Sequence, residues 1–162
     1  MEGNAEVFYF IALIAHSWFR WVALATLLFA IYTGVQGRLK KLRFSDQHAK
    51  IRLVALIACY IQLLLGLWLY FISPIVEMFW LHRKEAMTDK VMRYWSIEHA
   101  SVMILALTII TYGYYRSHKT KSERKKFTLM AIYYGIGLLI ILVSIPWLAS
   151  SGVGRPIFRI PN

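Results

Sequence analysis

The sequence contains one cysteine and few acidic residues, and both shortages exclude classes of protein. Cys59 alone cannot form an internal disulfide, nor can it supply a multi-cysteine zinc or iron–sulfur site. Only 8 Asp and Glu residues stand against 19 Lys and Arg residues, which gives a net charge of +11. The chain also lacks a Gly-rich phosphate loop, paired carboxylates and a nucleophile–base arrangement, so it carries no hydrolase or transferase signature.

The excess of positive charge does not point to nucleic acid. The Lys and Arg residues cluster beside apolar runs, and the sequence has no motif that reads DNA or RNA. Basic residues in such places act as topology signals and contact anionic lipid headgroups. We therefore expect membrane lipids, including anionic headgroups at the basic loops, as partners, and no nucleic acid.

Apolar residues are what the sequence has in abundance. Hydrophobic residues make up 59% and aromatic residues 15% of the chain, and the mean hydropathy is +0.52, which is too apolar for an ordinary soluble domain. Four apolar runs reach the length of about 20 residues that a membrane-spanning helix requires; they cover residues 7–35, 53–72, 94–115 and 127–148. The sequence thus predicts an all-α integral membrane protein in which residues 1–162 form one domain, an up-down-up-down bundle of four transmembrane helices.

The basic residues predict the orientation of this bundle. The links between runs one and two and between runs three and four carry twelve Lys and Arg residues, against six in the other connection and the tail. We expect the protein to lie in the cytoplasmic (inner) membrane. The positive-inside rule then places both termini outside the cytoplasm. The long connection 73–93 is still partly apolar, so we expect a short interfacial helix there with Trp80 at headgroup depth. Pro146 should kink or end the fourth helix.

Three polar residues inside the apolar runs are the candidates for function. His16 and Arg20 lie in the first run and His99 lies in the third. An Arg in a membrane helix costs roughly 2.5–3.5 kcal/mol on insertion scales, so such residues usually face the bundle interior and have a task. Helices 1 and 3 of an up-down bundle are diagonal, which lets His16 and His99 face each other. Two such imidazoles are the ligand set of a low-spin haem b, and we predict that they bind the haem iron.

Other residues are candidates for the wall of this site. Gln62 is expected to face a haem pocket from the second run. Six aromatic residues are expected to line this pocket: Trp18, Phe19, Trp21, Trp68, Tyr70 and Trp95. Met103 is an alternative axial ligand, with a place in the apolar core as its other interpretation. For Arg20 several roles stay open: a haem propionate, Glu98, a quinone oxygen, or a purely structural contact to backbone carbonyls or Gln62.

Four sequence segments resemble a group of small bacterial four-span membrane proteins described as cytochrome b-like. The segments are HSWFRW (16–21), QLLLGLWLYFISP (62–74), EH (98–99) and IPW (145–147), and their order and spacing extend over nearly the whole chain. The resemblance implies a haem carried by the intramembrane histidines, here His16 and His99, and a link to a membrane electron-transfer chain. Such proteins are expected to have proline after Glu-His, where this chain has Ala100.

Three functions remain open at the level of sequence. The first is a b-type cytochrome-like electron-transfer protein, an enzyme only in the sense of a redox component, that exchanges electrons with a quinone and with a redox partner. The second is a haem-free accessory or structural subunit of a larger, respiratory-type membrane complex. The third is a quinone or lipid-headgroup site without haem, built around Arg20 and Gln62.

Overall fold

The computed structural model describes residues 2–147 and 152–154, and these are helical with no strand among them. The long helices are α1 (Glu2–Leu39), α2 (Asp46–Ile72), α6 (His99–Lys119) and α7 (Glu123–Ser144). Within these described residues, four helical stretches are long and apolar enough to cross a membrane: 6–39, 46–72, 90–119 and 123–144. The predicted all-α fold with four candidate membrane spans is confirmed.

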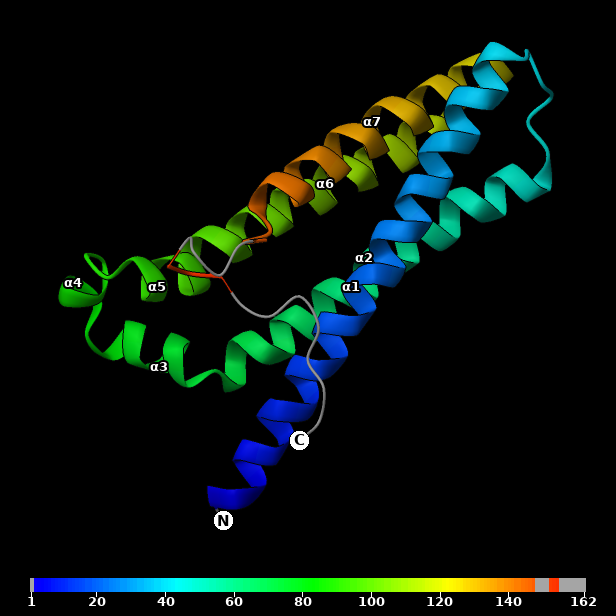
Figure 1. The fold of residues 1–162 in the computed structure, drawn as a ribbon. Coiled ribbons are helices and arrows are strands. Elements are labelled where there is room, and N and C mark those ends of the chain that lie inside the picture. The colour runs from blue at the N-terminus through cyan, green and yellow to red at the C-terminus, as the bar shows by residue number, and fades with distance from the viewer. Residues whose placement is uncertain (1, 148–151, 155–162) are drawn as a thin grey trace.

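The long helices form an antiparallel bundle in which the chain reverses direction at each link (Figure 1). The links α1–α2 and α6–α7 lie at the same end, where Arg43 Nε is 3.9 Å from Glu123 Oε1. We call this the basic end, and the opposite end, which carries the connection between α2 and α6, the α3–α5 end. Helix α1 packs along α2 and α7, while α6 packs along α7 and, over a shorter stretch, along α2. As predicted, α1 and α6 are therefore the diagonal pair.

Local signals move the ends of two helices away from the predicted limits. Helix α2 begins at Asp46 rather than at residue 53, because Ser45 ends the preceding link as an extended residue and its N–H donates to His48 Nδ1 at 3.0 Å. Helix α7 ends at Ser144, so the predicted fourth span, which ran to residue 148, was wrong at its end. Pro146 cannot donate a helical hydrogen bond, and the helix stops just before it.

The connection between α2 and α6 folds into short helices, as the sequence predicted for part of it. These are α3 (Pro74–Leu81), α4 (Arg83–Ala86) and α5 (Lys90–Arg93); α3 continues beyond the end of α2, and α4 and α5 turn back toward α6 (Figure 1). Pro74 starts α3, where its missing N–H costs nothing. Trp80 Nε1 donates to the Tyr70 hydroxyl at 3.1 Å, which ties α3 back to the last turns of α2.

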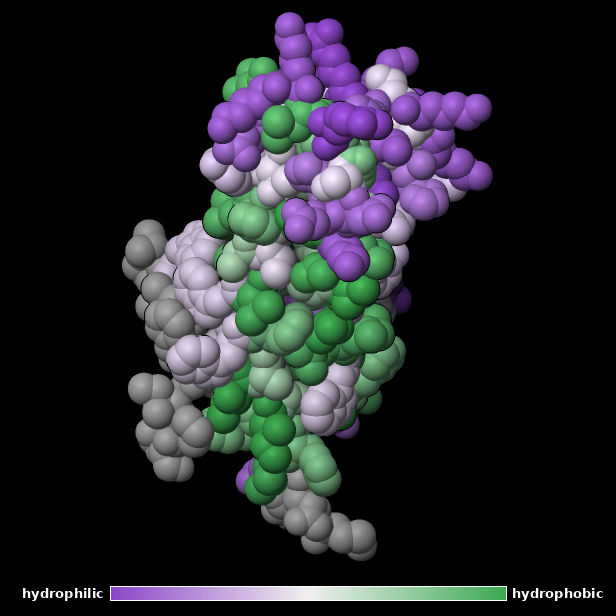
Figure 2. Space-filling view, turned by 90° about the vertical axis from the view of Figure 1, so that its right-hand side faces the viewer, coloured by the Kyte–Doolittle hydropathy of each residue, from purple (hydrophilic) through white to green (hydrophobic). Residues whose placement is uncertain are grey.

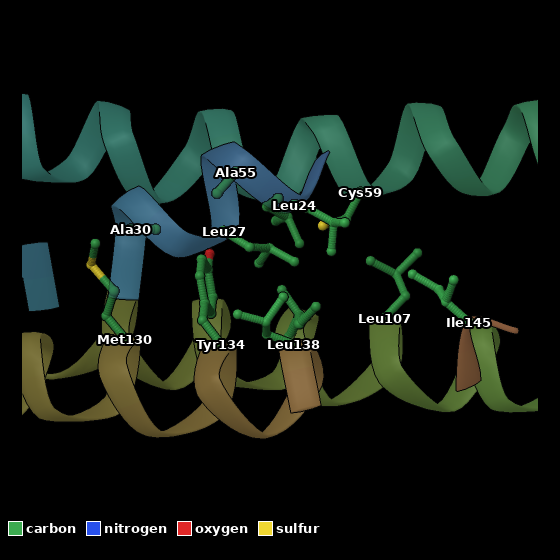
Figure 3. Packing of buried hydrophobic residues seen from close by; sticks show 12 residues of the cluster. Leu24, Leu27, Ala30, Ala55, Cys59, Leu107, Met130, Tyr134, Leu138 and Ile145 are labelled. Atoms are coloured by element: carbon green, nitrogen blue, oxygen red, sulfur yellow. The ribbon is translucent and has the colours of Figure 1, made fainter. Parts of the chain in front are cut away.

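Buried apolar residues from the four long helices form one core inside the bundle (Figure 3). Leu27 of α1, Ala55 of α2, Ile110 of α6 and Tyr134 of α7 are all fully buried in it. Glycines bring the helices close: a Cβ at Gly137 would lie 2.7 Å from Ile110 Cδ1. Small residues that allow such close approach are typical of helix pairs in membranes.

Arg52 is part of this core, which the sequence did not predict. It was grouped with the basic residues of the α1–α2 link, yet only 4% of it is exposed. Its Nη1 donates to Ser117 Oγ at 2.6 Å, its guanidinium lies 4.8 Å from the Tyr114 ring centroid, and its backbone carbonyl accepts from the Tyr134 hydroxyl at 2.8 Å. Arg52 therefore joins α2 to α6 and α7 and does not contact headgroups.

The outside of the bundle is apolar along most of its length (Figure 2). Leu28, Leu64, Leu139 and Val143 are each more than half exposed. Polar side chains gather instead at the basic end, which forms one hydrophilic cap in Figure 2. A broad exposed apolar surface of this kind, together with four candidate spans, is what a membrane protein presents to lipid.

Candidate functional site

A cavity of about 200 Å³ lies between the core and the α3–α5 end of the bundle. It is bounded by α1, α2, α6 and the residues at the end of α7. The predicted site residues that line it are His16, Arg20, Gln62, Tyr70, Trp95 and His99. Most of the predicted site residues therefore line one cavity, although they come from three different helical segments.

His16 is held against α2 by two residues that are one helical turn apart. Gln62 Nε2 donates to the His16 carbonyl at 3.0 Å and lies 3.2 Å from His16 Nε2. A Cβ added at Gly66 would lie 3.0 Å from His16 Cε1, so the glycine makes room for the imidazole. A ring nitrogen that accepts from an amide carries a lone pair, which is also what a metal ion requires of it.

His99 enters the cavity from an irregular turn. Residues Tyr94–Glu98 form a π-helical turn, η1, and the His99 N–H donates to the Tyr94 carbonyl five residues earlier. The wider turn changes the helical register just before His99, and π turns of this kind often occur at functional sites. The rings of Trp95 and Tyr94 lie 5.3 and 5.9 Å from the His99 ring, centroid to centroid. Nothing in the sequence alone indicated this turn.

Arg20 brings a cation to the deeper part of the cavity. It follows His16 by four residues on the same face of α1, as predicted, and its guanidinium lies 5.4 Å from the Trp21 ring centroid. Glu98, one of the partners considered for it, is exposed and accepts from Arg93 Nε at 2.6 Å. Glu98 therefore lies at the exposed edge of the bundle with Arg93.

Four of the predicted lining residues lie outside the cavity: Trp18, Phe19, Trp21 and Trp68. Trp18 is 50% exposed and Trp68 41% exposed, and neither lines the cavity. Trp18 follows His16 by two residues, which is about 200° around an α-helix. Because His16 faces the cavity, Trp18 must face outward. The prediction that Trp18 lines the site was therefore wrong, and the helical period alone is enough to show it.

Several residues that the sequence analysis did not place in the site also line it. Tyr9 and Ser17 of α1 are among them, as is Cys59 at the deep end, whereas Tyr70, near the α3–α5 end, lines the cavity as expected. Met103, considered as an alternative ligand, lines the cavity one turn after His99. The signal for the α2 residues was available, because Cys59, Gln62, Gly66, Tyr70 and Ser73 repeat at helical spacing.

The metal-binding potential of the site depends on histidine. Among residues 2–147 and 152–154, no group of three or more His, Cys, Asp or Glu side chains could hold a metal ion. What the cavity does contain is two imidazoles on diagonal helices, within an otherwise largely apolar lining. Such a donor set cannot complete a tetrahedral protein site, but it suits a group that brings its other ligands with it.

No family model matches the chain, and neither a curated protein nor a solved structure matches it. The resemblance to cytochrome b-like proteins therefore stays a prediction.

Proposed function

We propose that the protein is a b-type cytochrome-like electron-transfer component that binds one haem b between α1 and α6. The observation that supports this is the presence of His16 and His99, from diagonal helices, in one cavity. Haem b brings most of the ligands of its iron with it and, when bound, would supply one-electron redox chemistry. His16 and His99 would hold the iron.

The other lining residues fit a haem in charge and in polarity. The cavity wall is largely apolar, with Leu13, Leu107 and Ile141 among its members, and such a wall excludes water. Arg20 supplies one positive charge, which suits an anionic propionate or a quinone oxygen. Gln62 contacts the His16 Nε2 that a metal would use, so it would give up that contact on haem binding.

The volume of the cavity fits a haem less closely than its lining residues do. The cavity holds about 200 Å³, whereas pockets for ligands of drug size hold about 300–1,000 Å³. Haem would therefore have to displace side chains that now fill the space. Helices α2 and α6 pack against each other over a shorter stretch than the other neighbouring spans do. We therefore expect these two helices to separate most easily to admit a haem.

We further propose that the protein lies in the cytoplasmic membrane with both termini outside the cytoplasm. The links at the basic end, with the helix ends beside them, carry twelve Lys and Arg residues, and Figure 2 shows the hydrophilic cap that they help to form. The positive-inside rule assigns such an end to the cytoplasm. The proposed haem would then lie in the outer half of the membrane.

An absorption spectrum of the purified protein, oxidised and reduced, tests the haem. We expect a Soret band and, with pyridine, the spectrum of a b-type haemochrome at about one haem per chain, as two axial ligands in one cavity imply. A colourless protein that still folds would overturn the proposal. If the colourless protein also co-purifies with other subunits, the accessory-subunit hypothesis becomes the better one.

Gly66→Ala should weaken haem binding without removing a ligand. The added Cβ would lie 3.0 Å from Cε1 and 3.5 Å from Nδ1 of His16, so the imidazole has to shift. Crowding a packed site costs about 1–3 kcal/mol, so we expect haem affinity to fall about tenfold, measured by haem titration of the apoprotein. Gly135→Ala is the control, because a Cβ there meets no described atom within 4 Å. Equal affinities in the two variants would contradict the close contact between Gly66 and His16.

A quinone is the second candidate ligand, because Arg20 and Gln62 line the same cavity. A guanidinium and an amide are suitable donors for the two carbonyl oxygens of a quinone head. An organic extract of the purified protein should then contain quinone, and Arg20→Gln should remove it. Quinone in an extract from colourless protein would favour a quinone site without haem.

A further inference from the structure

A second hollow, of about 630 Å³, lies at the basic end between three helices. The last turns of α1 and α6 and the first turns of α7 form it. Five cations line it, together with Thr120, Thr128 and Leu129; they are Arg38, Arg116, Lys119, Arg124 and Lys125. No acidic side chain lines it.

The charges of these cations are not balanced by the described part of the chain. The ion pairs recorded among the described residues are Arg43 with Glu123 and Arg93 with Glu98. None of the five cations lies within the same 4.0 Å limit of a described carboxylate. Like charges gathered around one hollow repel one another, and an anion bound among them would turn that repulsion into attraction.

Two arginines of the hollow each hydrogen-bond to a neighbouring hydroxyl. Arg38 Nε donates to Thr128 Oγ1 at 3.0 Å, and that hydroxyl donates to the Arg124 carbonyl at 2.9 Å. Arg116 Nη1 donates to the Tyr112 hydroxyl at 2.6 Å. These bonds use one nitrogen of each guanidinium, and the planar fork of donors of an arginine matches the oxygens of a phosphate group.

Helix dipoles do not explain the whole cluster. Cations at the C-terminal ends of α1 and α6, such as Arg38 and Lys119, are stabilised by those ends. Arg124 and Lys125 instead lie in the first turn of α7, which is the positive end of that helix. Cations there are disfavoured, whereas a bound anion would be stabilised both by them and by the helix end.

The surroundings of the hollow indicate that the anion comes from a lipid. Tyr112 and Tyr115 are exposed beside it, and Lys119 Nζ lies 5.5 Å from the Tyr115 ring centroid. Tyrosines of this kind are typical of the membrane–water interface, which is the depth of lipid phosphates. We propose that this hollow binds the phosphate of one anionic lipid headgroup. The site is separate from the haem cavity, and the inference does not depend on haem.

Native mass spectrometry of the full chain, titrated with phosphatidylglycerol or with zwitterionic phosphatidylethanolamine, tests the site. The triple variant Arg116→Gln, Lys119→Gln, Arg124→Gln removes three exposed charges of the hollow. The matched control Lys40→Gln, Lys41→Gln, Lys50→Gln removes three exposed charges of the same end that do not line it. We expect the first triple to lose affinity for one retained phosphatidylglycerol about tenfold, and the control to lose less than about twofold, since each nearby charge contributes separately.

Binding of inorganic phosphate, followed by calorimetry, separates the two sources of a phosphate group. The lipid site is supported if the first triple loses affinity for phosphatidylglycerol and the matched control does not. The single variant Arg38→Gln should also lose affinity for phosphatidylglycerol. Inorganic phosphate binding that is lost in the first triple, without any preference for phosphatidylglycerol, would assign the hollow to a soluble phosphate and overturn the lipid assignment. Equal effects in the two triples, or binding of neither anion, would overturn the site itself.

Discussion

His99→Ala and His16→Ala should each reduce the Soret absorption of the purified protein to the background of a haem-free preparation. Each substitution removes one of two axial donors, and the described cavity has no third histidine to replace it. Because each imidazole would supply one of the two protein ligands to the iron, loss of either should weaken haem binding enough for the cofactor to be lost during purification. Absorption per chain, with the pyridine haemochrome as the measure of haem content, reports the effect.

His82→Ala is the control for these two variants, because His82 is exposed in the connection between α3 and α4 and lies outside the cavity. Its spectrum should be that of the unchanged protein. Imidazole added to the His99→Ala variant should restore part of the band by entering the space that the side chain left. If His99→Ala keeps a normal band while Met103→Leu loses it, the second ligand is Met103 and the assignment of His99 is wrong.

The parts of the site that the sequence predicted are those that depend on helical periodicity alone. His16 and Arg20 are four residues apart, so any helix places them on one face, and both line the cavity. Gln62 lies near the middle of an apolar run, where a polar side chain turns inward to find a partner. The prediction that Trp18 lines the site was wrong because it rested on the aromatic ring alone, although the position of Trp18 on the helix points it away from His16.

Other features depend on packing between segments and could not be predicted in this way. The π turn at Tyr94–Glu98 sets the direction of His99, but its one-residue shift of register leaves no trace in composition. Arg52 looked like one of twelve basic residues beside apolar runs, and only the contact with Ser117 and the tyrosines shows that it is buried. Run length predicted the four spans, whereas Ser45 and Pro146 set where two of the helices begin and end.

The seam between α6 and α7 should be the place where the fold tolerates an added methyl group least. A Cβ at Gly113 would overlap Tyr133 Cβ and lie 2.8 Å from Tyr133 Cγ. Those atoms are at the root of the tyrosine side chain, so they can move only if the two helix backbones separate. We expect Gly113→Ala to lower the free energy of unfolding by about 1–3 kcal/mol, the usual cost of overpacking. Thermal unfolding in mild detergent, followed by helical circular dichroism, measures it.

Gly135→Ala makes the same chemical change on the partner helix and should have the opposite sign. A Cβ at Gly135 meets no described atom within 4 Å, so the substitution only lowers the backbone freedom of the unfolded chain and should raise stability by about 0.5–1 kcal/mol. Helix propensity alone would stabilise both variants equally. A difference in sign between them therefore measures the close contact at Gly113, and equal stabilisation would mean that α6 and α7 lie farther apart than the structure has them.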